Sequence, residues 1–340
     1  MARVRIFLFT HRRPLLLRRA LVSLLAQTDS DWRCELHNDA PDDDEPRTIL
    51  QDVAPADPRF TYHAHERNWG AVASFNHAYA GGPEAFASLL EDDNWWEPDF
   101  LASAFAALTA RPNAALVWAN MRIWQEQSDL TWTDTRETIW RVKSSVPQIV
   151  EFSLPELLQA FDALHSNGAM MFRPDRFKPS NVPLTTPFAI VEQMRERAAT
   201  GSLLLLTKPL ANFARTLTTA RDSQPSNWLQ AKLLLAASFF KVCPVTNEAL
   251  EKIWEVRRNQ RPRDVGIFFY LALILRDRRL VASARVSDWL HFLLNVGRHP
   301  SQFLRGLRFR GDHPEVWNWL CAQTAANARP VTATVYTKQI

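Results

Sequence analysis

Glycine and cysteine are both scarce in this chain. Its 340 residues include 9 glycines and 3 cysteines. The low glycine content favours a helix-rich protein. Cys34, Cys243 and Cys321 are odd in number and lie far apart, so they match neither a disulfide framework nor a Cys-x-x-Cys metal site. This cysteine usage is typical of a protein from a reducing compartment.

Long uncharged apolar runs are also lacking. The longest, residues 265–275, is about half of what is needed to span a bilayer. The apolar stretch in the opening segment MARVRIFLFTHRRP is far shorter than the core of a signal peptide. We therefore expect a cytoplasmic protein, and peripheral attachment to the inner face of the membrane stays open.

Charge is unevenly distributed along the chain. Residues 1–220 carry 22 Lys and Arg against 27 Asp and Glu, whereas residues 221–340 carry 18 against 9. A basic tail behind an acidic body favours an anionic partner such as a membrane surface or a phosphorylated acceptor, although a solvated basic helical face explains it equally well. The apolar helical faces of the tail also permit a homodimer. Nucleic-acid binding rests on the charge alone, and we do not expect it.

Short apolar runs alternate with helical patterns over the first 120 residues, which predicts an α/β fold with a mainly parallel sheet. Strands are expected at 3–9, 32–38, 60–65, 86–90, 116–123, 167–172 and 203–206, and helices at 14–27, 48–53, 97–110 and 190–200. Residues 68–80 are expected to be a loop that leads into a helix. Residues 128–142 fit a hairpin or an ordered lid. Beyond residue 221 the pattern is helical to about residue 323, which divides the chain into a body, 1–220, and a helical C-terminal region, 221–340.

An acidic run, Glu91-Asp92-Asp93-Asn94, follows a predicted buried strand. Residues two apart on a strand share a face, so Glu91 and Asp93 are expected to point the same way at the sheet edge where open sheets bind ligands. Crowded carboxylates suit Mg²⁺ or Mn²⁺ bound together with phosphates. Capping of the helix that follows is the alternative. A second acidic loop, residues 39–44, is expected at the same edge and favours a ligand.

Four blocks of sequence, in order, carry a resemblance to a known family. They are FTHRRPLLLRRALVSLLAQT, HNDAPDDD, DPRFTYHAHERNWGAVASFNHAYA and SLLEDDNWWEPDFL. Together they resemble the nucleotide-sugar half of a family 2 glycosyltransferase of the GT-A fold. The resemblance implies a Rossmann-like sheet flanked by helices, with a nucleotide-sugar-binding half at residues 1–120 and an acceptor half at 121–220.

The resemblance also implies which residues bind the donor. Those that match the family's donor-binding elements are Thr10, Arg13, Asp39, Asn68, Gly70 and Asn76. Asp39 takes the role of the aspartate that binds uracil. The chain departs from the family pattern at Phe9, His11 and Arg12 in the first block and at Asn38 in the second.

The family's Asp-x-Asp motif maps onto Glu91, Asp92 and Asp93, with Glu replacing the first Asp. Asp93 is therefore the expected ligand of a divalent metal, Mn²⁺ or Mg²⁺, and Glu91 and Asp92 are expected near the ribose or behind the metal. His165 is a further candidate for the metal or a phosphate, with a structural histidine as the alternative. Arg215, in a segment that resembles the family's closing strand, is expected to reach the diphosphate.

The resemblance implies a reaction that inverts the sugar carbon. Such a reaction requires a general base to take the proton of the acceptor hydroxyl. Family members place a carboxylate on a helix in the second half, and Glu192 is the residue at the corresponding place, followed one helical turn later by Glu196. A surface carboxylate without catalytic role is the alternative for Glu192.

The resemblance implies a metal-dependent, inverting glycosyltransferase of the hexosyl or N-acetylhexosaminyl type. The expected donor is a UDP-sugar, and the acceptor is a glycan, a lipid-linked molecule or a small molecule. A sugar-phosphate nucleotidyltransferase is disfavoured, because FTHRRP lacks the glycine-rich loop that such enzymes need after the first strand. The strongest alternative is a degenerate module that binds a nucleotide sugar or a partner enzyme without turnover, as the substitutions at His11, Arg12, Asn38 and Glu91 suggest.

Overall fold

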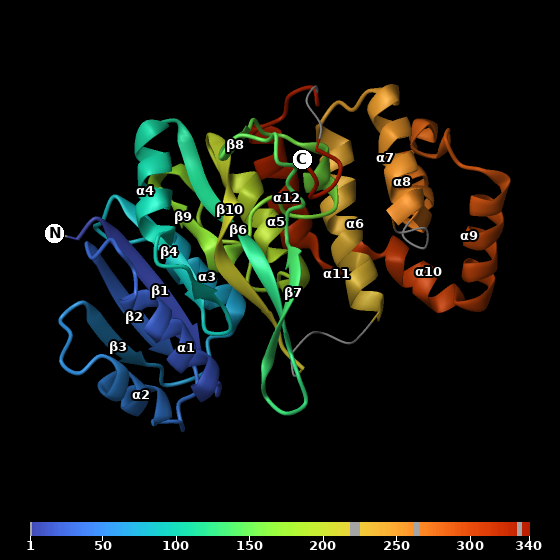
Figure 1. Ribbon diagram of the computed structural model, residues 1–340. Helices are drawn as coiled ribbons and strands as arrows, with labels where there is room; N and C mark the ends of the chain where they lie inside the picture. Colours follow the sequence, from blue (N-terminus) through green and yellow to red (C-terminus); the bar gives the residue numbers. More distant parts are fainter. Residues whose placement is uncertain (1, 218–224, 261–264, 332–334) are drawn as a thin grey trace.

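A single mixed sheet organises the body of the molecule (Figure 1). The computed structural model describes residues 2–217, 225–260, 265–331 and 335–340. The strands are β1 (Val4–Thr10), β2 (Trp32–Asn38), β3 (Phe60–Ala64), β4 (Phe86–Glu91), β5 (Trp95–Trp96), β6 (Ala114–Glu126), β7 (Trp132–Thr138), β8 (Ile149–Phe152), β9 (Met170–Phe172) and β10 (Ser202–Arg215). Within the described ranges they join in the order β3-β2-β1-β4-β9-β6-β10-β5, with β7 beside β6 and β8 beside β10.

Most of the long strands run in one direction. β1 pairs in parallel with β2 and β4, β2 with β3, and β6 with β10, while the short strand β9 lies antiparallel between β4 and β6. The predicted mainly parallel sheet is therefore confirmed. The segment after β6 turns back as β7 and pairs antiparallel with it, so the hairpin alternative for residues 128–142 is confirmed. The short strand β5 was not predicted.

Helices follow the strands in the body and dominate the C-terminal third. The α-helices are α1 (Pro14–Leu25), α2 (Glu45–Val53), α3 (Ala71–Ala80), α4 (Phe100–Ala110), α5 (Val191–Ala198), α6 (Pro225–Val242), α7 (Asn247–Gln260), α8 (Gly266–Leu275), α9 (Val286–Arg298), α10 (Pro300–Leu307), α11 (Phe309–Asp312) and α12 (Pro314–Ala326). Short 3₁₀ turns are η1 (Leu157–Ala160), η2 (Asn167–Ala169), η3 (Pro174–Arg176), η4 (Phe188–Ile190) and η6 (Arg278–Val281). Pro14 opens α1 at the first helical position, where proline is well tolerated.

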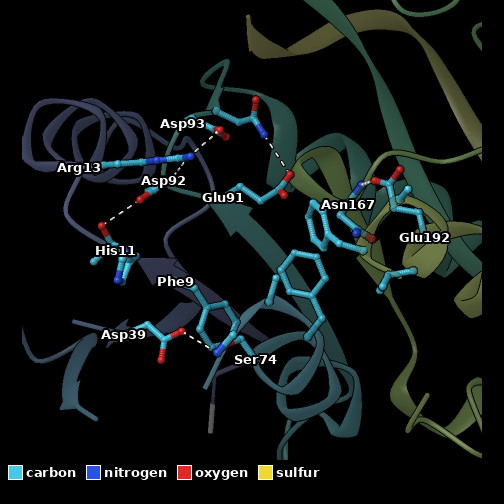
Figure 2. Close-up of a pocket in the computed structure, with 18 of the residues that line it drawn as sticks. Phe9, His11, Arg13, Asp39, Ser74, Glu91, Asp92, Asp93, Asn167 and Glu192 are labelled. Carbon is cyan, nitrogen blue, oxygen red and sulfur yellow. Dashed lines mark hydrogen bonds and ion pairs between the residues drawn. The ribbon is translucent and has the colours of Figure 1, made fainter. Parts of the chain in front are cut away.

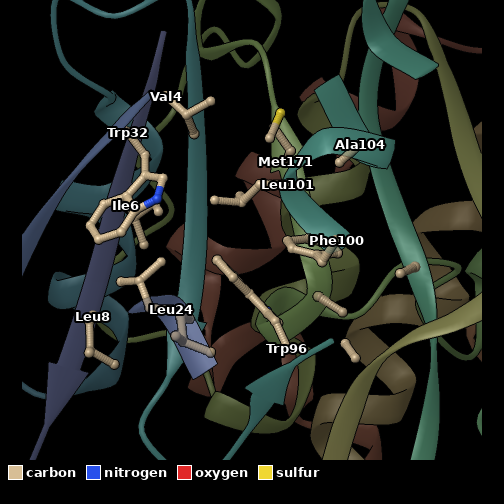
Figure 3. Close-up of a cluster of buried hydrophobic side chains, with 14 of the residues drawn as sticks. Val4, Ile6, Leu8, Leu24, Trp32, Trp96, Phe100, Leu101, Ala104 and Met171 are labelled. Carbon is tan, nitrogen blue, oxygen red and sulfur yellow. The ribbon is translucent and has the colours of Figure 1, made fainter. Parts of the chain in front are cut away.

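The alternation of side chains along the strands divides the core of the body into two layers. Ile6 and Leu8 of β1 point to the face covered by α1, α2 and α4, where they pack with Trp32 and Trp96 (Figure 3). Phe7 points to the opposite face, which is covered by α3 and by the chain between β7 and β10. Both faces are thus buried, and the carboxyl ends of the parallel strands are left to form a site.

The C-terminal helices share a core with the second half of the body. Leu157, Ile190 and Met194 belong to the same apolar cluster as α6, α8 and α12. Arg197 is buried and donates to the Ser238 hydroxyl at 2.6 Å and the Leu235 carbonyl at 2.7 Å. The division at residue 220 falls among residues 218–224, outside the described residues, and it stays a prediction.

The end of the chain returns to the body. The backbone N–H of Leu158 donates to the carbonyl of Val335 at 2.8 Å, and Gln339 forms a bridge with Arg141. The carboxylate of Glu156 accepts the Val335 N–H at 3.0 Å. Within the ranges that the structure describes, no helix combines the length and apolarity that a bilayer crossing requires.

Candidate donor and acceptor site

One pocket, of about 730 Å³, lies where the carboxyl ends of β1 and β4 meet α3, α5 and the end of β10 (Figure 2). Nine of the predicted site residues line it: Thr10, Arg13, Asp39, Asn68, Gly70, Glu91, Asp92, Asp93 and Glu192. The structure thus brings residues from positions 10 to 192 around a single cavity of the size that small-molecule sites usually have.

The acidic turn after β4 is tied to the turn after β1. The Thr10 hydroxyl donates to Asp92 Oδ2 at 2.9 Å, and Arg13 Nη1 lies 3.2 Å from Asp92 Oδ1 and 3.0 Å from Asp93 Oδ2. Arg19 of α1 adds a hydrogen bond to the carbonyl of Asp93 at 2.8 Å. β1 and β4 are adjacent parallel strands, so their ends meet at the same edge and these contacts become possible.

The carboxylates of this turn are crowded. Burial raises the pKa of Asp92 to about 6, although Arg13 opposes the shift. Burial, together with the charges of Asp93 and Glu192, raises the pKa of Glu91 well above its usual range, and burial also raises the pKa of Asp93. Arg13 therefore compensates the negative charge only in part. An oxygen-only set with unbalanced negative charge fits a hard divalent cation.

Asp39 organises the loop between β3 and α3. Its Oδ1 accepts the backbone N–H of Trp69 at 2.6 Å and lies 3.0 Å from His65 Nδ1, while its Oδ2 accepts the N–H of Gly70 at 3.0 Å. Asn68 Oδ1 also accepts the Gly70 N–H, at 2.7 Å. Gly70 has φ +75°, a left-handed conformation that glycine adopts without strain. Asp39, Asn68 and Gly70 therefore act together to shape one side of the pocket.

Asn94 and Gly168 complete the acidic turn, and no role was predicted for Asn94. Asn94 Nδ2 donates to Glu91 Oε2 at 3.1 Å, and Asn94 Oδ1 accepts the N–H of Ala214 at 3.3 Å. A Cβ atom at Gly168 would lie 2.4 Å from Asn94 Nδ2 and 2.8 Å from Glu91 Oε2. The absence of a side chain at residue 168 is therefore what leaves room for the Glu91–Asn94 pair.

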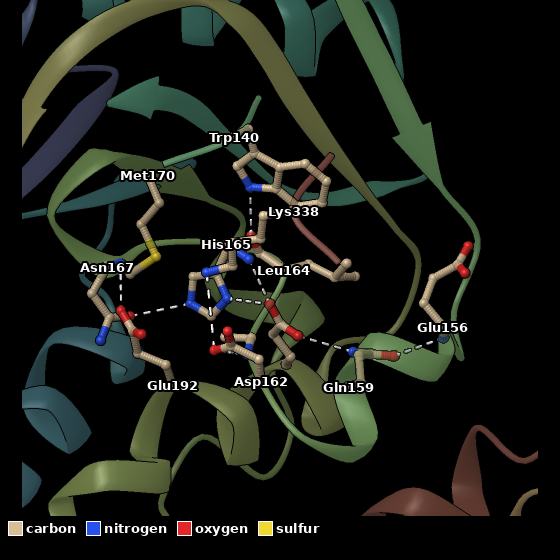
Figure 4. Close-up of polar contacts among 12 residues, drawn as sticks. Trp140, Glu156, Gln159, Asp162, Leu164, His165, Asn167, Met170, Glu192 and Lys338 are labelled. Atoms are coloured by element: carbon tan, nitrogen blue, oxygen red, sulfur yellow. Dashed lines mark hydrogen bonds and ion pairs between the residues drawn. The ribbon is translucent and has the colours of Figure 1, made fainter. Parts of the chain in front are cut away.

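Glu192 lies on the opposite wall, in the first turn of α5. Its Oε1 accepts the backbone N–H of Asn167 at 2.9 Å. The side chain of Asn167 lies 3.1 Å from His165 Nε2, and His165 Nδ1 lies 2.7 Å from Glu196 Oε1 (Figure 4). Glu196 also accepts a hydrogen bond from Gln159 at 3.0 Å. The segment that holds Glu192 is thus anchored on a buried polar network.

Three predicted site residues do not line the pocket. His165 is fully buried; burial alone would lower its pKa, but the hydrogen bond and charge of Glu196 outweigh burial and raise it. The side chain of Asn76 bonds the backbone of Val182 in both directions at 3.0 Å and accepts a hydrogen bond from Arg195 at 2.7 Å. Arg215 is exposed, and its Nη1 lies 3.7 Å from Glu137 Oε2. The structure places all three outside the cavity.

Aromatic residues supply much of the remaining lining. They come from β1, α3, η4, β10 and α6, and they are Phe9, Phe75, Phe188, Phe213 and Trp228. No sequence motif marks Phe188 or Phe213, because they reach the pocket only through the packing of η4 and β10 against the body. Trp96, which the motif placed beside the acidic turn, is buried and donates to the Gly168 carbonyl at 2.7 Å.

Comparisons with known proteins bear on the family and the fold. The family model described as glycosyl transferase family 2 matches residues 6–175, half of the chain. The crystal structure of S. aureus TarS has a TM-score of 0.55 at 13% identity, covering 90% of this chain and 54% of that one. Its fragment 1–349, in complex with UDP-GlcNAc, has a TM-score of 0.53 at 11% identity, covering 96% of this chain and 89% of that one.

A curated relative is matched over a shorter stretch. The uncharacterized protein y4gI of Sinorhizobium fredii is 28% identical over 107 residues, which is 32% of this chain and 12% of that protein. The matched stretch therefore covers a small part of this relative, and the chain spans about half of the first TarS chain. The structural neighbours, at such low identity, show the shared GT-A fold.

Proposed function

Because the chain belongs to glycosyl transferase family 2, we propose that it transfers a sugar from a UDP-sugar to an acceptor in a metal-dependent reaction that inverts the anomeric carbon. One observation carries the proposal: a single pocket holds a crowded acidic turn on one wall and the carboxylate of Glu192 on the other. The complex of the TarS fragment with UDP-GlcNAc supports a UDP-sugar of the N-acetylhexosaminyl type.

Asp93, assisted by Glu91 and Asp92, would hold the divalent metal, Mn²⁺ or Mg²⁺. When bound, such an ion supplies positive charge to the diphosphate leaving group. Arg13 contacts both carboxylates, but Asp92 also accepts the Thr10 hydroxyl, so we assign Asp93 as the ligand and Asp92 as a support. Arg13 provides a second positive charge beside the diphosphate.

The loop organised by Asp39 would receive the nucleoside. Asp39 holds the backbone of Trp69 and Gly70, and Phe9 and Phe75 offer apolar surface in the same cavity. A flat base packs well on aromatic surface, and the backbone of a preformed loop orients it without loss of conformational entropy.

Glu192 would act as the general base. Its Oε1 is fixed by the Asn167 N–H, which orients the carboxylate, and its second oxygen can then accept the proton of the acceptor hydroxyl as that hydroxyl attacks the sugar carbon. His165 and Glu196 are positioning residues in this scheme, because they hold Asn167 rather than the substrate.

The acceptor side is proposed more broadly, as a glycan, a lipid-linked molecule or a small molecule. Peripheral membrane contact is supported by α9, which exposes Leu290, Leu293 and Leu294 by 55, 58 and 54%. Co-sedimentation with anionic vesicles tests this contact, and retention in the supernatant at low salt would reject it. We also propose that residues 1–220 form the catalytic unit. A homodimer is a further proposal.

The reaction is tested by following a set of UDP-sugars with Mn²⁺ by proton NMR. We expect release of UDP and, where water replaces the acceptor, a first-formed sugar of inverted anomeric configuration. Glu192→Gln should lose this turnover, while the matched control Glu255→Gln, an exposed glutamate of α7, should retain it. Retained configuration, or turnover unchanged in Glu192→Gln, would reject the proposed mechanism.

A module that binds the donor without turnover is the second candidate, and one contact favours it. Arg13 Nη1 lies between Asp92 and Asp93, where a guanidinium can balance part of the acidic turn without a metal ion. Such a module would bind UDP equally well with Mn²⁺ and with chelator and would release no UDP from any UDP-sugar. Metal-dependent turnover rejects it.

A further inference from the structure

A second cavity, of about 650 Å³, lies on the face of the sheet beside α3 and is rich in histidine. Four of the nine histidines of the chain line it: His37, His63, His65 and His77. Glu35 lines it as well. Glu35 and His37 are two apart on β2 and therefore share a face, and the strand register places His63 of β3 directly opposite His37.

Three ligand atoms in this cavity converge. His37 Nε2 lies 3.2 Å from Glu35 Oε2, and His77 Nε2 lies 3.5 Å from the same oxygen. All three ligand atoms lie within 4.8 Å of one another. Two ligands at about 2.0–2.1 Å from a tetrahedral Zn²⁺ are about 3.3 Å apart, so the first two separations match the edges of such a site.

The hydrogen bonds behind His37 orient it for metal binding. The Asp39 carboxylate can only accept, so His65 Nδ1 donates to it at 3.0 Å. A neutral His65 then presents Nε2 as an acceptor for His37 Nδ1–H at 3.0 Å. A neutral His37 consequently turns the lone pair of Nε2 towards the Glu35 carboxylate, and two acceptors face each other. A cation between them removes this repulsion, and a ligating histidine is usually oriented by a hydrogen bond from its second ring N–H, as His37 is by its bond to His65.

Charge and access are compatible with a cation. The second oxygen of Glu35 pairs with Arg5, but Arg5 also pairs with Glu84, at 2.6 Å and 2.8 Å, so the positive charge of Arg5 is shared by two carboxylates. His77 is 42% exposed, which leaves a route from solvent. His63 Nε2 is buried without a hydrogen-bond partner among the described residues, and the His63 ring stacks on that of His37.

We propose that Glu35, His37 and His77 bind a divalent transition-metal ion of the Zn²⁺ class, at a site separate from the donor pocket. Imidazole and carboxylate ligands suit Zn²⁺, whereas Mg²⁺ prefers the oxygen-only set around Asp93. Three protein ligands leave a fourth position for water. The link from His37 through His65 to Asp39 ties this ion to the loop that borders the donor pocket.

To test this proposal, metal-free Asp93→Asn protein is titrated with Zn²⁺ and with Co²⁺. Calorimetry follows the binding of Zn²⁺, and visible absorption follows the binding of Co²⁺. The Asp93→Asn background weakens metal binding at the donor pocket. We expect one equivalent of Zn²⁺ and the visible bands of tetrahedral Co²⁺. A further His77→Ala change should weaken binding about 100-fold or more, and His65→Gln by about 10–100-fold, since even partners behind the ligands contribute that much.

His291→Ala, which removes an exposed histidine of α9, is the matched control and should leave binding unchanged. Circular dichroism checks that each variant folds. Failure of the Asp93→Asn protein to bind a stoichiometric ion, or equal affinities of the His77→Ala and His291→Ala variants, would overturn the proposal. Neither result bears on UDP binding by the unsubstituted protein, so the proposed function is tested separately.

Discussion

The two walls of the donor pocket handle negative charge in opposite ways. On the wall formed by β1 and β4, Glu91, Asp92 and Asp93 are adjacent, and burial raises the pKa of each of them. On the wall formed by α5, Glu196 is buried but accepts hydrogen bonds from His165 and Gln159, and Glu192 accepts one from Asn167. One wall is incompletely compensated and the other is largely satisfied.

This difference separates binding from positioning. A crowded, under-compensated turn gains free energy when a cation arrives, so it is built to bind. A hydrogen-bonded network gains nothing from a further ligand, but it fixes the carboxylate that it supports. Substitutions on the first wall should therefore change metal dependence, and those on the second should change the rate of the transfer step.

The largest effect is expected for Asp93→Asn on the crowded wall. Transfer should fall by about 10³-fold, because the leaving diphosphate loses the metal-bound charge that stabilises it. The melting temperature should not fall, since the change removes one of several crowded carboxylates. Asp52→Asn, an exposed aspartate of α2 that pairs with Arg18, is the control. Steady-state rates at several Mn²⁺ concentrations measure the effect, and a rate equal to that of the control would break the comparison.

Glu192→Gln tests the satisfied wall. The transfer rate should drop by about 10²-fold or more, as expected for loss of a general base, while the affinity for UDP persists. Glutamine keeps an oxygen that can accept the Asn167 N–H, so the local structure should hold. Paired measurements of kcat and UDP affinity decide the point. Loss of both together would make Glu192 a structural residue and erase the distinction between the walls.

Gly168→Ala probes the place where the walls meet. The added Cβ would lie 2.4 Å from Asn94 Nδ2, so the Asn94–Glu91 pair has to move, and UDP affinity with Mn²⁺ should fall by roughly tenfold, about 1.4 kcal/mol. Gly297→Ala in α9, where nothing lies within 4 Å of the new methyl group, is the matched control. Calorimetry measures both variants. If they bind UDP alike, the tight contact at residue 168 does not shape the acidic turn.

The smallest effect concerns Glu156, behind the satisfied wall. Burial raises the pKa of Glu156 to about 7, although the Val335 N–H opposes the shift. The pKa of Glu156 is higher in the folded state than in the unfolded state. Its favourable contribution to the free energy of unfolding is therefore complete below about pH 4.5 and is lost as the pH rises through about 7.

Glu156→Gln removes that titration. Its melting temperature should exceed that of the unsubstituted protein by roughly 2–5 °C at pH 8 and match it near pH 4.5. Thermal melts across this range follow the difference. A constant difference at all pH values would mean that Glu156 does not titrate with folding.

The crowded wall was the part that could be predicted from sequence. Thr10 is the last residue of β1, Asp39 directly follows β2, and Asp93 lies two residues beyond the end of β4. Because the ends of neighbouring parallel strands meet at one edge, short motifs were enough to place these residues in one pocket. The family model confirms the family resemblance, and the structural neighbours confirm the fold.

The rest depended on contacts between segments far apart in the sequence. Phe188 and Phe213 reach the pocket through packing, which no periodic pattern encodes. His165 was a candidate metal or phosphate ligand because histidine often has that role, but its hydrogen bond with Glu196 holds the ring in the core. Asn76 satisfies the backbone of Val182, 106 positions away, and the histidine cavity likewise requires the pairing of β2 with β3.

The most direct test of the account is calorimetric titration with UDP, in Mn²⁺ and in chelator, of the unsubstituted protein and of Asp93→Asn. GDP and dTDP serve as controls for the base. We predict that Mn²⁺ strengthens UDP binding by the unsubstituted protein and has little effect on Asp93→Asn. UDP binding that is equally tight in Mn²⁺ and in chelator, or absent in both, would contradict a metal-dependent donor site on the crowded wall.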